Sequence, residues 1–143
     1  MEYPFTLDLK ITPHFRLAEF SCRRNYKPCP LCGGSIRLMD LPLIWRTAYD
    51  LERLRENLSI WFGREVEIIL TDARRCLGRA AIISTVDPPW NDPHFAGFAI
   101  DIIARIVKTK TPVPLDKLGE ASREIFKDGR ILIEDDHVHV DLT

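Results

Sequence analysis

The strongest constraint on the fold is an amphipathic segment at residues 41–61. Apolar side chains recur in it at spacings of three and four, while arginine, aspartate and glutamate occupy the other faces. This period predicts a helix that buries one stripe of side chains in a core. The stripe consists of Leu41, Ile44, Ala48, Leu51, Leu54 and Leu58.

A strand is predicted directly after this helix. Phe62-Gly63 supplies a stop, because glycine adopts the left-handed conformation that ends many helices. Residues 66–70 are then short, apolar and rich in β-branched side chains, as is typical of a strand. Residues 98–107 form a second run of this kind, and residues 131–133 and 137–142 predict two short closing strands. A second helix is expected at residues 115–126, with Pro114 near its start.

Residues 71–93 predict a long irregular connection. Pro88-Pro89 and Asn91-Asp92-Pro93 are turn signals that oppose regular strand pairing. A loop of this length in a small domain is usually functional or disordered.

These elements predict an α+β fold with a small, mainly antiparallel sheet flanked by helices. A chain of 143 residues fits one domain, 1–143, and can bury a core without disulfides. Residues 1–40 are expected to be loop-rich and to contain a cysteine knuckle. The order of the strands stays open.

The charge balance gives no reason to expect nucleic acid or an anionic membrane as a partner. The chain has 20 basic and 21 acidic residues. Residues 1–15 lack the basic and apolar regions of a secretory signal, and no apolar run approaches the roughly 20 residues of a membrane span. We therefore expect synthesis as a soluble cytoplasmic chain, with a monomer as the expected oligomeric state.

Histidines and an aspartate cluster in two short segments. His94 and Asp101 lie seven residues apart, with the small residues Gly97 and Ala99 between them. His137 and His139 lie near the carboxyl terminus and would share one face of a strand. Two imidazoles and one carboxylate suit a catalytic zinc ion, which keeps its fourth position for water. The spacing therefore predicts a zinc site formed by His94, Asp101 and a histidine of the closing strand, with zinc-bound water as a nucleophile.

The run His94-x-x-Gly97-x-Ala99-x-Asp101, followed by residues 136–141, DHVHVD, resembles a known family. It is similar to the zinc D-alanyl-D-alanine carboxypeptidases and the phage L-alanyl-D-glutamate endopeptidases, whose fold is shared with the hedgehog signalling domain. The family pattern begins with serine, where this chain has Asp92. The resemblance extends in order from the first helix to the last strand.

The resemblance implies a role for each matching residue. His94, Asp101 and His139 would be the metal ligands. Asp136 falls at the position of the catalytic carboxylate, which transfers protons between water and the leaving amine; Glu134 and Asp135 are its acidic neighbours. His137 would hydrogen-bond the tetrahedral intermediate or orient the carboxylate.

The family also carries an arginine after the first strand, which contacts the substrate carbonyl or carboxylate. Aligning Thr71 and Cys76 with the threonine and cysteine of some members selects Arg75, and Arg74 is the alternative. The Gly-Gly element and asparagine that members often carry before the first histidine are replaced here by residues 77–92. This loop is expected to line the substrate groove.

The four cysteines form a second candidate metal group. Cys29-x-x-Cys32 followed by Gly33-Gly34 resembles a zinc knuckle. With Cys22 and Cys76, it could form an all-thiolate structural zinc site next to Arg75. Disulfides are the alternative, less expected in the absence of a secretory signal.

The function expected is a zinc-dependent peptidase, of the carboxypeptidase or endopeptidase type, that cleaves peptidoglycan stem peptides after release or delivery to the cell wall, as a phage endolysin does. The alternative is a non-catalytic hedgehog-like zinc-binding module for cell-wall or protein recognition. A zinc-ribbon nucleic-acid binder would leave His94, Asp101 and His139 unexplained.

Overall fold

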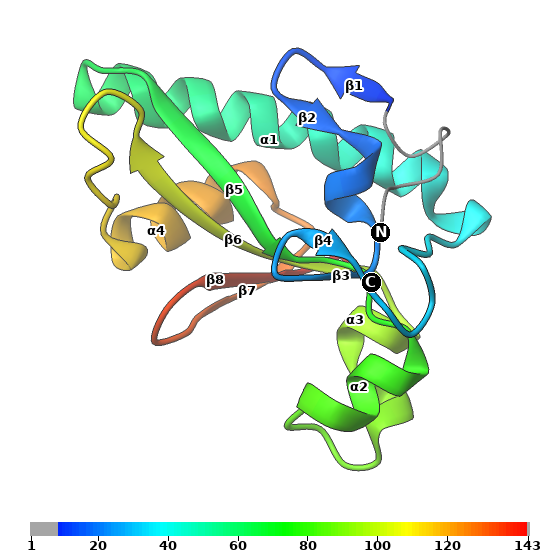
Figure 1. The fold of residues 1–143 in the computed structure, drawn as a ribbon. Coiled ribbons are helices and arrows are strands. Elements are labelled where there is room, and N and C mark those ends of the chain that lie inside the picture. Colours follow the sequence, from blue (N-terminus) through cyan, green and yellow to red (C-terminus); the bar gives the residue numbers. More distant parts are fainter. Residues whose placement is uncertain (1–8, 143) are drawn as a thin grey trace.

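The computed structural model describes residues 9–142. Residues 1–8, which include part of the segment considered for a secretory signal, lie outside the described residues. The described residues fold as an α+β structure (Figure 1), and three antiparallel sheets are found among them. The elements of the amino-terminal part are β1 (Lys10–Thr12), β2 (Phe15–Arg16), η2 (Leu17–Phe20), β3 (Arg23–Arg24), β4 (Lys27–Pro28) and η3 (Leu38–Asp40).

The central sheet has four strands in the order β5-β6-β8-β7. Every neighbouring pair in it is antiparallel. This confirms the mainly antiparallel sheet and adds the strand order that the sequence left open. Its strands are β5 (Val66–Asp72), β6 (Ala99–Ile106), β7 (Arg130–Ile133) and β8 (Val138–Asp141).

Helix α1 (Leu41–Phe62) confirms the predicted amphipathic helix. It ends at Gly63, whose φ of 64° is the left-handed conformation expected of the stop. The buried stripe differs slightly from the prediction, because Thr47 is buried while Leu41 is only half-buried at the start of the helix. Helix α4 (Leu115–Ile125) confirms the second helix.

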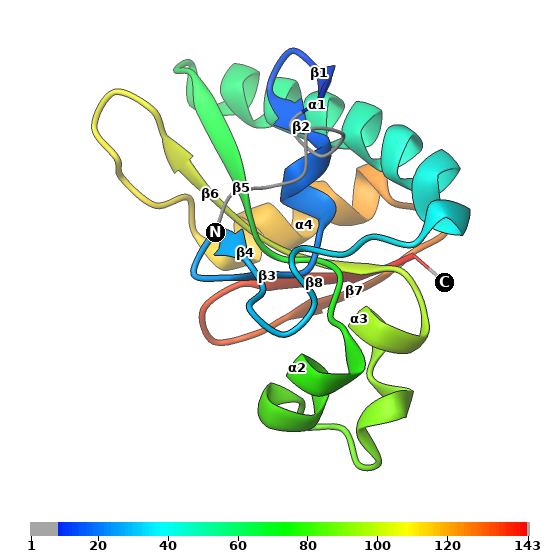
Figure 2. The same cartoon turned by 45° about the vertical axis from the view of Figure 1, so that its right-hand side comes forward.

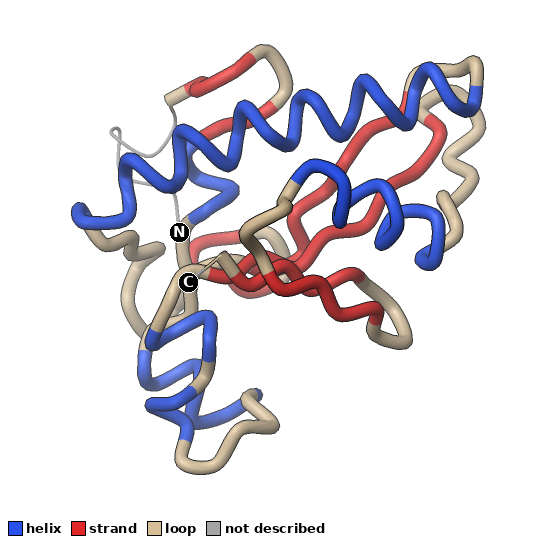
Figure 3. The backbone as a smooth tube through the Cα atoms, turned by 180° about the vertical axis from the view of Figure 1, so that it is seen from behind, coloured by secondary structure: helices blue, strands red, loops and turns tan. Residues whose placement is uncertain are grey.

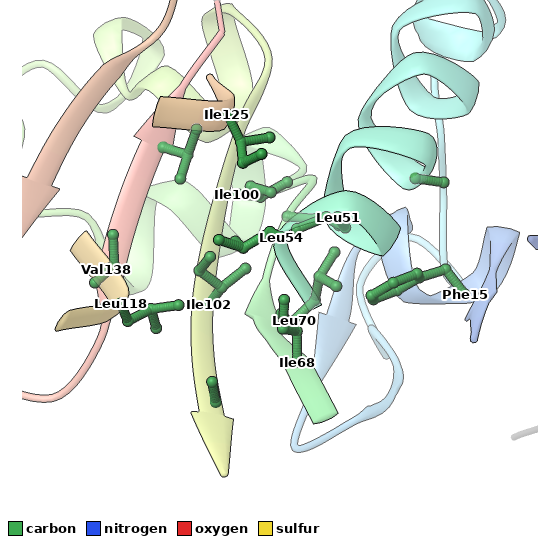
Figure 4. Close-up of a cluster of buried hydrophobic side chains, with 14 of the residues drawn as sticks. Phe15, Leu51, Leu54, Ile68, Leu70, Ile100, Ile102, Leu118, Ile125 and Val138 are labelled. Atoms are coloured by element: carbon green, nitrogen blue, oxygen red, sulfur yellow. The ribbon is translucent and has the colours of Figure 1, made fainter. Parts of the chain in front are cut away.

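The core lies between the sheet and these two helices. Seen from behind (Figure 3), α1 and α4 both cover the same side of the sheet. Alternate side chains of β5, β6 and β8 point toward the helices and are buried, among them Leu70, Ile100, Ile102 and Val138 (Figure 4). The residues between them point to the other side of the sheet, where the polar cluster described below is assembled.

The prediction of an irregular connection over residues 71–93 was wrong in part. Strand β5 continues to Asp72, and the connection contains α2 (Leu77–Ile83) and η4 (Pro89–Asn91) before α3 (Pro93–Ala96). Figure 2 shows α2 and α3 projecting from one end of the sheet. The sequence of α2 shows no amphipathic period, because its apolar residues Ile82 and Ile83 are exposed and only Ala80 is buried.

No helix in residues 9–142 combines the length and the apolar character required to cross a membrane.

Two substitutions on α1 test the placement of the core. Leu54 is fully buried, whereas Ile60 on the same helix is 73% exposed. Leu54→Ala should lower the free energy of unfolding by about 2–5 kcal/mol, because it opens a cavity. Ile60→Ala should change it by less than about 0.5 kcal/mol. Urea denaturation monitored by circular dichroism measures both, and equal effects would contradict this helix orientation.

Candidate metal centre

The register of the sheet places Asp101 beside His139. Asp101 in β6 and His139 in β8 are direct partners across the antiparallel pair. Their neighbours Ile100, Ile102 and Val138 point into the core, so the two polar side chains share the opposite face. The His139 Nδ1 atom lies 2.8 Å from the Asp101 Oδ1 atom.

His94 reaches the same carboxylate from α3. Its backbone N–H donates to the Asp92 side chain, which caps the amino terminus of this short helix. Its Nδ1 atom lies 2.7 Å from the Ala73 carbonyl oxygen, which can only accept, so Nδ1 carries a proton. The other ring nitrogen, Nε2, is thereby directed at Asp101 Oδ1, 3.3 Å away.

His94, Asp101 and His139 together form a group that could hold a metal ion. Their donor atoms all lie within 4.8 Å of one another. His94 and Asp101 are buried, and His139 is half-buried. A carboxylate oxygen with imidazole nitrogens on two sides, one of them oriented by a backbone carbonyl, is a donor set that fits a divalent cation.

The electrostatics of this group favour a cation. Burial alone would raise the pKa of Asp101, but hydrogen bonds from His139 and His94 hold it well below its usual range. Burial alone would lower the pKa of His94, and the hydrogen bond and charge of Asp101 raise it above its ordinary value. Asp101 is therefore an ionised carboxylate at neutral pH.

His137 and Asp136 lie on the solvent side of this group. The His137 Nε2 atom is 3.5 Å from Asp101 Oδ1, and its Nδ1 atom is 2.6 Å from Asp136 Oδ1. His137 precedes β8 instead of lying within it, which corrects the predicted strand boundary. The Asp136 side chain is 87% exposed. The imidazole of His137 thus connects the buried carboxylate of Asp101 to the exposed carboxylate of Asp136.

The acidic neighbours of Asp136 have no comparable contact with the group. Glu134 and Asp135 are exposed in the turn between β7 and β8. The turn is closed by the Glu134 N–H, which donates to the His137 carbonyl.

Arg75 is held beside the group by two carboxylates. Its Nε atom donates to Asp72 over 2.8 Å and its Nη1 atom to Asp92 over 2.7 Å. Its Nη2 atom lies 3.9 Å from Asp101 Oδ2. Burial alone would lower the pKa of Arg75, but the two bonded carboxylates raise it, so the guanidinium stays charged.

Arg74, the alternative to Arg75, has a different environment. Its Nη1 atom donates to the Phe95 carbonyl oxygen over 2.7 Å, and its guanidinium lies over the Phe95 ring. Burial and the nearby Arg37 lower its pKa. Of the two arginines, Arg75 is the one in ionic contact with Asp101.

The four cysteines converge at a separate place. The sulfurs of Cys22, Cys29, Cys32 and Cys76 all lie within 4.8 Å of one another, so this is a second group that could hold a metal ion. Burial raises the pKa of Cys22 and of Cys76. Burial alone would also raise the pKa of Cys32, but hydrogen bonds from the Ser35 hydroxyl and amide lower this pKa to about 7.

His14 lies outside both groups. Its Nδ1 atom and its backbone N–H both contact the Glu52 carboxylate, which joins the β1–β2 hairpin to α1.

Sequence reasoning assigned no role to two carboxylates that support the group, Asp72 and Asp92, although Asp92 was named as the residue at the position of the family's serine. Asp92 is fully buried and binds both Arg75 and the His94 amide. A signal for it exists, because aspartate directly before a proline is typical of a helix start. Asp72 binds Arg75 and Arg79, three and seven residues further along the chain, and this close spacing of opposite charges is its only sequence signal.

No family model matches the chain, and neither the curated proteins nor the solved structures give a match.

Asp92 should be a main support of this site. Asp92→Ala removes the cap of α3 and leaves Arg75 without one of its two partners, and we expect the free energy of unfolding to fall by about 3 kcal/mol. Asp92→Asn should cost less, because the amide oxygen can still accept from His94. Asp128→Ala is the control: that side chain is 95% exposed and should change stability by less than about 0.5 kcal/mol. Urea denaturation would contradict the assignment if Asp92→Ala and Asp128→Ala had equal effects.

Proposed function

We propose that this chain is a zinc-dependent peptidase of the hedgehog/DD-peptidase fold that hydrolyses stem peptides of peptidoglycan. The observation that carries the proposal is the convergence of His94, Asp101 and His139 next to the solvent-facing pair of His137 and Asp136. A site with metal donors alone serves structure, whereas a base at its open side serves hydrolysis.

The donor set favours zinc among the common divalent ions. Two imidazoles and a single carboxylate suit zinc, whereas calcium and magnesium prefer oxygen ligands. Three protein ligands leave one position for water or substrate. Bound zinc would polarise the scissile carbonyl and lower the pKa of water toward neutrality.

Three further residues of the chain would take part in the hydrolysis. Asp136 takes a proton from the attacking water and delivers it to the leaving amine. His137 orients this carboxylate through the 2.6 Å contact with its Nδ1 atom. Arg75 keeps a fixed positive charge beside Asp101, and its Nη2 atom is the one left to face a substrate oxygen.

The contacts of Arg75 also support the alternative, a non-catalytic zinc-binding module. Two of its three guanidinium nitrogens already donate to Asp72 and Asp92, which is the arrangement of a structural arginine. Such a module would bind zinc at His94, Asp101 and His139 and recognise the cell wall or a protein without cutting a bond.

Purified peptidoglycan distinguishes the two functions. The zinc-loaded protein should release muropeptides with new termini, which mass spectrometry identifies together with the bond cleaved. A chelator should stop the release, and added zinc should restore it. Cleavage of the D-Ala-D-Ala bond or of the L-Ala-D-Glu bond would each support the proposal. An absence of new termini from zinc-loaded protein would contradict it and favour the binding module.

Asp136→Ala tests the base. We expect kcat to fall by about 10²–10⁴-fold, the usual contribution of general acid–base catalysis, while the zinc content is unchanged. Asp135→Ala, which removes an exposed carboxylate from the same turn, is the matched control and should retain activity. Loss of zinc from Asp136→Ala would show that this carboxylate is a ligand instead of the base.

A further inference from the structure

The four cysteine sulfurs converge although they come from two separate parts of the chain, residues 22–32 and residue 76. Cys22 and Cys29 flank the β3–β4 hairpin, Cys32 follows it, and Cys76 lies directly after Arg75. In Figures 1 and 2 the hairpin lies against the end of β5, and Arg23 donates to the Leu70 carbonyl oxygen at this contact. The four thiols are therefore gathered by tertiary structure.

The distances between the sulfurs favour a shared metal ion over disulfides. The Cys29 and Cys76 sulfurs are 4.0 Å apart. A disulfide would need about 2.05 Å. Two sulfurs bound to one tetrahedral zinc, each at about 2.3 Å, are roughly 3.8 Å apart. The observed distance is close to this value, and all four sulfurs are close enough to one another to surround a single ion.

Backbone and hydroxyl donors point at these sulfurs. The Cys76 N–H donates to the Cys22 sulfur over 3.3 Å, and the Ser35 N–H and hydroxyl donate to the Cys32 sulfur over 3.4 and 3.2 Å. The Arg79 N–H donates to the Cys76 sulfur over 3.5 Å. Such donors stabilise thiolates and orient them toward a metal.

Two glycines after Cys32 allow the tight turn that brings Cys29 and Cys32 together. Gly33 and Gly34 have φ angles of 74° and 87°, a conformation that other residues rarely adopt. The Gly33 N–H donates to the Cys29 carbonyl over 2.7 Å, which closes the tight turn between the two cysteines.

We propose that Cys22, Cys29, Cys32 and Cys76 form a closed, tetrahedral zinc site that fastens the β3–β4 hairpin to the segment carrying Arg75. Four thiolates fill the coordination of zinc, so no position is open for water and the site is structural. Each thiol releases its proton on binding. The proposal of this site does not rest on the peptidase activity proposed above.

The cysteine site positions the other group through a short chain of contacts. Cys76 is bonded to Arg75, Arg75 binds Asp92, and Asp92 binds the His94 amide. The Arg75 N–H also donates to the His94 carbonyl over 3.0 Å. Fixing Cys76 therefore fixes the segment against which His94 is held.

Metal analysis of the full chain tests this site. The zinc-loaded protein should contain two zinc ions per chain, Cys32→Ser should contain one, and His139→Ala should also contain one. Leu31→Ser changes an exposed side chain between Cys29 and Cys32 and should keep both ions. A single zinc in the unaltered protein that is lost in His139→Ala would overturn the proposal.

Two measurements on the unaltered protein keep the test valid if the cysteine variants do not fold. Protein refolded with cobalt(II) should show the charge-transfer absorption of a tetrahedral thiolate site, and a thiol-specific mercurial should release one ion of the two. A thiol count in denaturant should find four free thiols after the metal is removed. Absence of the thiolate absorption, or absence of free thiols because disulfides have formed, would overturn the proposal.

Discussion

The antiparallel pairing of β6 with β8 is the constraint on which the rest of the site depends. It sets Asp101 opposite His139 while Ile100, Ile102 and Val138 are buried against α1 and α4. A shift of the register by one residue would exchange the two faces of the strand, exposing the apolar side chains and burying the polar ones. The hydrophobic core therefore specifies the geometry of the polar group, although it contributes no donor to it.

Outside the sheet, the site is held together by the pairing of buried charged side chains. Asp92 is fully buried, and burying a carboxylate without partners is costly. The His94 amide and the Arg75 guanidinium satisfy it, and Arg75 is in turn held by Asp72 at the end of β5. This network ties α3 to the sheet and keeps the ring of His94 against the Ala73 carbonyl. The same contacts limit the freedom of the Arg75 side chain to move.

The sequence predicts the helices and strands whose apolar residues recur with a clear period. It does not predict contacts between residues that are distant in the sequence. The stripe of α1 and the run of β5 could be predicted because α1 buries residues at spacings of three and four, and β5 buries every second residue. Helix α2 could not be predicted in this way, since its apolar residues do not form a buried stripe. The convergence of His94 with Asp101 and His139 was expected from spacing and from the family resemblance. The binding of Arg75 by Asp92, 17 residues further along the chain, depends on a contact that only the folded chain makes.

The two candidate metal groups share one short segment. Residues 72–76 contribute Cys76 to one group and, through the Ala73 carbonyl and Arg75, orient His94 and face Asp101 in the other. Residues 73–76 of this segment lie between β5 and α2, so neither a strand ladder nor a helix stabilises them. Because donors scattered in the unfolded chain bind metal weakly, the free energy of binding at such sites stabilises the folded state. A metal on the cysteines would therefore help to order the segment that holds His94, and a metal on the histidine group would stabilise the same segment.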